Sequence, residues 1–128
     1  MRRLASLLLL CLTITGAHAA GPAPQSFVVY FSEWSAALDD SANGIVGHAA
    51  DFAKEHPHAT IAVNGFASTV GSRKANDLLA DLRAQVVVDQ LLADSVPASR
   101  IHQRGHGPKQ YALTPQESRR VEISVSDR

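Results

Sequence analysis

Cysteine is nearly absent from this 128-residue chain, which contains only Cys11. No disulfide can therefore form within it, and the fold has to be held by its core even in an oxidising compartment. The same shortage removes the usual thiolate ligands of structural metal sites. The six histidines occur at spacings that match no standard metal-binding cluster. We expect neither a metal nor another cofactor.

An excess of charge of either sign is also missing, because 12 basic residues face 12 acidic ones. A balanced charge is not the footprint of a nucleic-acid-binding protein. Gly65 and Gly71 have five residues between them, and Ser72 stands where a phosphate loop has lysine, which excludes a nucleotide site of that type. Ser68 has no recognisable nucleophile elbow around it, so we expect a protein that is not an enzyme.

Long apolar runs are absent except at the start of the chain. Arg2 and Arg3 precede an apolar segment over residues 4–14, and Ala17-His18-Ala19 follows it. This pattern predicts a signal peptide over residues 1–19, with an uncleaved anchor as the alternative. The apolar run is too short to predict a confident membrane span. Residues 20–26 then form a short linker that contains proline, and a single domain is expected over residues 27–126.

The rest of the chain alternates between strand and helix patterns. Asp39, Asp40 and Ser41 offer capping oxygens for a first helix, which Pro57 ends. Ser72 offers a cap for a second helix that runs to about Ala93, with Leu79, Leu82 and Val86 expected on its core side. Strands are predicted over Phe27–Phe31, Ala59–Gly65, Ser99–Gly105 and Arg119–Val125.

The order of these segments is β-α-β-α-β-β. It predicts an α/β (α+β) two-layer sandwich, in which two helices pack on one face of a small mixed sheet. The loop between the second strand and the second helix, "GFASTVGS", contains no charged residue. Loops at this place commonly hold ligands in α/β proteins, so this loop is a candidate site.

Five stretches, in this order, resemble one known family. They are "FSEWSAAL" (residues 31–38), "NGFASTVGS" (64–72), "NDLLADLRAQVV" (76–87), "RIHQRGHG" (100–107) and "SRRVEISV" (118–125). They are similar to segments of the OmpA-like C-terminal domain, the peptidoglycan-binding module shared by OmpA porins, the Pal lipoprotein and the MotB stator protein. The resemblance covers roughly residues 27–126.

The resemblance implies a binding site for the free end of diaminopimelate in the peptidoglycan stem peptide. The helix arginine of the family, which grips a carboxylate, matches Arg83, and the family's asparagine matches Asn76. The loop aspartate, which takes the ammonium group, falls on Ser68, so its charge is missing. The candidate ligand-binding residues are Arg83, Asn76, Ser68, Thr69 and Phe66.

Three functional hypotheses follow. The first is an exported, non-enzymatic module that binds peptidoglycan in the periplasm, near the outer membrane or cell wall. The second is a degenerate domain that acts as a structural module or contacts envelope proteins, because Ser68 lacks charge and the segment after Gly107 departs from the family pattern. The third is a loop that takes another anion at a helix N-terminus. Arg119 and Arg120 are expected to have structural roles, and Trp34 to lie in the core or at a rim.

Overall fold

The computed structural model describes residues 23–106 and 115–127. The expected signal peptide and residues 20–22 of the expected linker lie outside the described residues, as does much of the divergent segment after Gly107. No helix in the described ranges has the length and apolar character needed to cross a membrane. The same ranges contain no group of three or more side chains suited to hold a metal ion.

The observed elements follow the predicted order, with two short helical additions. In chain order they are β1 (Gln25–Tyr30), α1 (Asp40–Glu55), β2 (Thr60–Phe66), α2 (Arg73–Ala93), the 3-10 helix η1 (Ala98–Arg100), β3 (Ile101–His106), α3 (Pro115–Ser118) and β4 (Arg120–Ser126). The predicted capping residues are confirmed at both long helices. Asp39 accepts from the N–H of Ala42 at 2.7 Å, and Ser72 accepts from the N–H of Ala75 at 3.3 Å.

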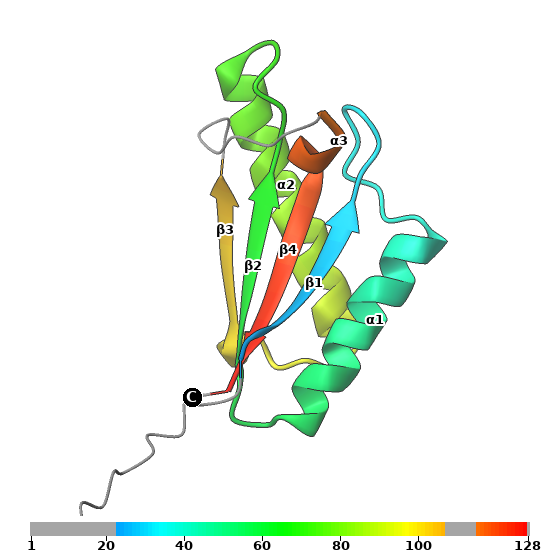
Figure 1. Ribbon diagram of the computed structural model, residues 1–128, viewed down its shortest axis with the longest axis vertical. Helices are drawn as coiled ribbons and strands as arrows, with labels where there is room; N and C mark the ends of the chain where they lie inside the picture. Colours follow the sequence, from blue (N-terminus) through cyan, green and yellow to red (C-terminus); the bar gives the residue numbers. More distant parts are fainter. Residues whose placement is uncertain (1–22, 107–114, 128) are drawn as a thin grey trace, which may run out of the picture.

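The four strands form one mixed sheet in the order β1-β4-β2-β3. β2 and β3 are parallel, and α2 supplies the crossover connection that parallel neighbours need. β4 is antiparallel to both β1 and β2. Both long helices cover one face, and the predicted α+β sandwich is therefore confirmed (Figure 1). β1 and β2 run in the same direction, so their carboxyl ends lie at the same end of the sheet. α2 and β4 begin at that end (Figure 1).

The core lies between the sheet and the two helices. α1 contributes an alanine-rich face, and its Phe52 ring lies 6.0 Å from that of Phe27 on β1. The fully buried sheet residues come from the alternate positions that face the helices. They are Val29, Ile61, Val63, Val121 and Ile123.

The face that α2 turns toward the sheet differs from the predicted one. Leu82 is 52% exposed, and Leu79 and Val86 are only partly buried, so the expected core side is wrong at Leu82. The helix instead buries smaller residues together with two polar ones: Asn76, Ala80, Arg83, Ala84, Val87, Val88 and Leu91. The close approach of the helix to Gly65 of β2 leaves room only for small side chains at Ala80 and Ala84.

Gly65 sets how closely α2 approaches the sheet. A Cβ atom at this position would collide with the carbonyl oxygen of Ala80 and would lie 3.0 Å from the Cβ of Ala84. The absence of a side chain therefore brings the backbone of α2 against β2. This close approach sets the depth at which the side chains of Asn76 and Arg83 lie.

Replacing Gly65 by alanine is expected to lower the free energy of unfolding by roughly 1–3 kcal/mol, because the helix must move away from the strand. Urea denaturation measures the change. Gly44→Ala is the matched control, since a Cβ there meets nothing within 4 Å. That control lies inside α1 and is expected to raise stability by up to ~1 kcal/mol. Equal effects of the two substitutions would contradict the close-packing argument.

Candidate functional site

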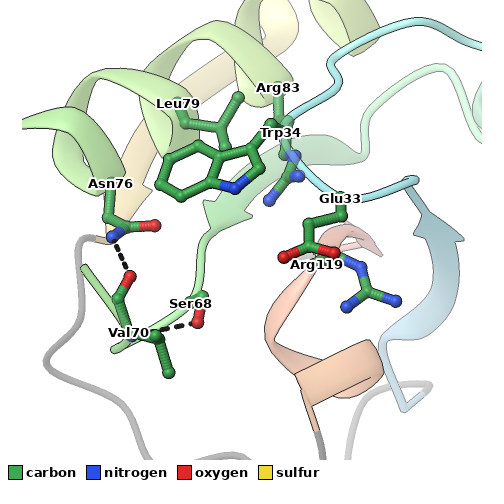
Figure 2. Close-up of a pocket in the computed structure, with 8 residues that line it drawn as sticks. All are labelled: Glu33, Trp34, Ser68, Val70, Asn76, Leu79, Arg83 and Arg119. Carbon is green, nitrogen blue, oxygen red and sulfur yellow. Dashed lines mark hydrogen bonds between the residues drawn. The ribbon is translucent and has the colours of Figure 1, made fainter. Parts of the chain in front are cut away.

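A pocket of about 220 Å³ opens beyond the carboxyl ends of β1 and β2, where α2 begins. It is formed by the segment between β1 and α1, the loop between β2 and α2, the first turns of α2 and the residue before β4. Eight side chains line it: Glu33, Trp34, Ser68, Val70, Asn76, Leu79, Arg83 and Arg119 (Figure 2). The pocket therefore joins three regions that are distant in sequence: residues 33–34, residues 68–83 and Arg119.

Arg83 is the buried centre of this region, with 0% of its surface exposed. Its Nε donates to the carbonyl oxygen of Ser35 at 2.8 Å, and its two terminal nitrogens donate to those of Phe66 at 3.2 Å and Ser32 at 3.1 Å. These bonds tie the segment after β1 to the end of β2. A guanidinium has five N–H donors. Three of them bind carbonyl oxygens of described residues, so two remain for a ligand.

The charge of Arg83 is neutralised by no nearby carboxylate. Among residues 23–106 and 115–127, no acidic group lies within 4.0 Å of it. Burial, and to a lesser extent the positive charge of Arg119, lower the pKa of Arg83 to about 10. Arg83 therefore stays charged at neutral pH, and its direct contacts among the described residues are three carbonyl oxygens and the Phe31 ring, 5.4 Å away. An anion that enters the pocket would be stabilised by this charge, which no carboxylate of the described residues contacts directly.

Asn76 holds the loop and leaves one polar atom unpartnered. Its Nδ2 donates to the carbonyl oxygens of Val70 at 2.8 Å and Ser72 at 3.0 Å. Its Oδ1 is buried and has no hydrogen-bond partner among the described residues. Figure 2 shows this oxygen on the pocket side of the amide. A buried acceptor without a partner costs about 1–3 kcal/mol, and a ligand N–H would remove that cost.

The remaining predicted site residues divide into two groups. Ser68 lines the pocket, and its hydroxyl accepts from the N–H of Val70 at 3.0 Å. Thr69 is exposed on the same loop and is not one of the lining residues. The Phe66 ring stacks on that of His106 at 5.0 Å, with the guanidinium of Arg120 4.0 Å from its centre. Strand alternation turns this ring to the open face of the sheet, so Phe66 contributes only its carbonyl oxygen.

Three polar or aromatic lining residues were not among the predicted site residues: Glu33, Trp34 and Arg119. Phe31 explains the position of Arg119, because its N–H donates to the Arg119 carbonyl at 2.8 Å and its carbonyl accepts from Arg119 Nε at 3.1 Å. Arg119 reaches the pocket because the first strand pairs with the last, which the sequence pattern alone does not reveal. Trp34 has a positive φ of 52°, and its indole lies across the pocket toward α2 (Figure 2). No sequence pattern marks that turn.

Comparison with known proteins then gives the family. The model of the OmpA family matches residues 30–122, nearly all of the folded domain. The chain belongs to the OmpA family. The predicted resemblance is thereby confirmed.

Individual relatives of this OmpA-family domain agree with the assignment. The chain is 32% identical over 104 residues to the probable lipoprotein YiaD of Escherichia coli, covering 77% of this chain and 48% of YiaD. It is 33% identical over 104 residues to the peptidoglycan-binding protein ArfA of Mycobacterium bovis, covering 77% of this chain and 32% of ArfA. The chain thus spans about half of the one relative and about a third of the other.

The fold also resembles that of the peptidoglycan-associated lipoprotein from Burkholderia pseudomallei. The TM-score is 0.70 at 23% identity, and the match covers 78% of this chain and 90% of that structure. At this identity the likeness concerns the fold.

Replacing Arg83 by methionine is expected to lower the free energy of unfolding by roughly 2–5 kcal/mol, because three carbonyl oxygens lose their donors together. Urea denaturation of the purified domain measures this. Arg104→Met is the control, since Arg104 is exposed on β3. It is expected to change stability by less than about 0.5 kcal/mol. Equal stabilities of the two variants would show that the Arg83 bonds do not hold the loops.

Proposed function

We propose that this OmpA-family domain binds the peptidoglycan stem peptide through the free, zwitterionic end of diaminopimelate. The observation that carries the proposal is the pairing of two unsatisfied groups in one pocket. Arg83 offers a charged guanidinium with spare donors, and Asn76 offers a buried acceptor without a partner. A ligand that presents a carboxylate and an ammonium group complements both.

The chemistry assigns a partner to each end of this ligand. The carboxylate would receive charge-assisted hydrogen bonds from Arg83, and Arg119 on the same pocket wall would add positive charge. The ammonium would donate to Asn76 Oδ1 and to the hydroxyl oxygen of Ser68. Trp34 and Leu79 would cover the methylene chain of the ligand, because both line the pocket with apolar surface.

We propose binding rather than catalysis for this pocket. The hydroxyl of Ser68 accepts from a backbone N–H, and no imidazole belongs to the lining residues. A serine nucleophile needs a neighbouring base to accept its proton. The name of the relative ArfA states that it binds peptidoglycan, which supports the same choice for this chain. With the export signal expected at residues 1–19, the proposed site of action is the periplasmic cell envelope.

A second candidate function is interaction with another protein without peptidoglycan binding. Its support is a set of large apolar side chains that are exposed near the pocket and along α2. Val70 is 73% exposed, Leu78 61% and Trp34 58%. Exposed apolar groups that lie together mark interaction surfaces in many proteins.

A ligand-side change tests the proposed function without disturbing the fold. The wild-type domain is expected to sediment with purified sacculi and to bind the tripeptide L-Ala-γ-D-Glu-meso-diaminopimelate. The same tripeptide with L-lysine in the third position keeps the distal ammonium but lacks the distal carboxylate of the side arm, and it is expected to bind at least about tenfold more weakly, because charged hydrogen bonds contribute about 1.5–3 kcal/mol. Backbone NMR titration measures both affinities.

Equal affinity for the two tripeptides would contradict the assignment of a carboxylate to Arg83. No sedimentation with sacculi, together with no shift of the resonances of residues 68–76, would contradict peptidoglycan binding and favour the interaction module.

A further inference from the structure

Glu33 brings the only negative charge to a pocket whose other ionisable lining residues are two arginines. Three of the eight lining side chains are ionisable, and two of these are the guanidinium groups of Arg83 and Arg119. Glu33 is the only carboxylate among the lining residues. Figure 2 shows its carboxylate between Arg119 and the centre of the pocket, on the side opposite Asn76. The negative charge of the pocket therefore comes from the segment between β1 and α1.

Glu33 is not committed to another partner. Within the described residues, the ion pairs at 4.0 Å or less are Lys54 with Asp51 and Arg120 with Glu122. Arg119, the cation beside Glu33 in the pocket, uses its Nε for the carbonyl of Phe31. A carboxylate that is free of such contacts can accept hydrogen bonds from a ligand without first breaking an internal pair.

The backbone on both sides of Glu33 is fixed. Arg83 binds the carbonyl oxygens of Ser32 and Ser35, which flank the turn that contains Glu33 and Trp34. The N–H of Ser35 also donates to the Ser32 carbonyl at 3.1 Å and closes this turn. Ordering of the backbone before binding reduces the entropy lost when a ligand is captured. The same arginine that is proposed to hold the ligand's carboxylate therefore also positions Glu33.

We propose that Glu33 supplies the negative charge that pairs with the ammonium group of the ligand, a role that the neutral oxygens of Asn76 and Ser68 cannot fill because they accept hydrogen bonds without carrying charge. This inference rests on the proposed function and concerns how the same pocket selects its ligand. Two guanidinium groups alone would accept any carboxylate of suitable size. Adding Glu33 makes the pocket complementary to a zwitterion, because a ligand without the ammonium would bring a carboxylate near that of Glu33 and offer Glu33 no positive group.

The test compares two tripeptides that differ only in the free amino group. One is L-Ala-γ-D-Glu-meso-diaminopimelate, and the other carries 2-aminopimelate, which retains the distal carboxylate and lacks the distal ammonium. Trp34 is the only tryptophan of the chain and lines the pocket, so its fluorescence reports binding. The wild-type domain is expected to bind the diaminopimelate peptide about tenfold more tightly than the other.

Glu33→Gln is expected to weaken binding of the diaminopimelate peptide about tenfold and to leave the 2-aminopimelate peptide unchanged or slightly stronger, so that the preference disappears. Glu55→Gln removes the same charge at the far end of α1 and is expected to behave as wild type. Urea denaturation should give the same stability for both variants, since both side chains are exposed. The double variant Glu33→Gln with Ser68→Asp is expected to recover the preference, because it returns a carboxylate to the pocket.

The outcomes separate the two proposals. If Glu33→Gln keeps the wild-type preference, the role of Glu33 is wrong while peptidoglycan binding stands. If the wild-type domain binds both tripeptides equally, selection for the ammonium is wrong. If it binds neither, the proposed function and this inference fail together.

Discussion

A buried, positively charged guanidinium holds the functional end of this domain together. Arg83 reaches from α2 to three carbonyl oxygens on two other segments, and it replaces the hydrogen bonds that water would otherwise make there. Bonds to a charged donor are stronger than bonds between neutral groups, so one side chain can order two loops. The pocket lies where Arg83 ties these two loops to the helix.

The two buried polar residues of α2 each use some hydrogen-bonding groups within the fold and leave others without a partner among the described residues. Arg83 uses three of its donors internally and retains two, whereas Asn76 uses both amide hydrogens internally and retains its oxygen. What remains in the pocket is a charged donor and a neutral acceptor, separated by about two turns of one helix. This division underlies the proposal of a ligand with both a carboxylate and an amine.

The depth of these side chains depends on small residues elsewhere. Gly65 allows the backbone of α2 to approach β2, and Ala80 and Ala84 fill the narrow space that results. From this depth the side chain of Arg83 reaches the carbonyl oxygens of Ser32 and Ser35 at the end of the sheet. Segments that seem unrelated in sequence, such as the glycine that ends "AVNG" and the turn around Glu33, are coupled through this single helix.

Local patterns in the sequence determined the elements, their caps and their order, because Asp39, Ser72 and Pro57 act on neighbouring backbone and need no distant partner. The resemblance to the OmpA-like domain also singled out Arg83, Asn76 and Ser68, which the structure brings to one pocket. Tertiary structure decided the rest. Leu82 faces outward because α2 turns the side with Ala80 and Ala84 toward Gly65, and Phe66 turns away because strand alternation directs its ring to the open face. Glu33 and Arg119 meet at the pocket because the first and last strands pair, and no local signal carries the position of a partner 86 residues away.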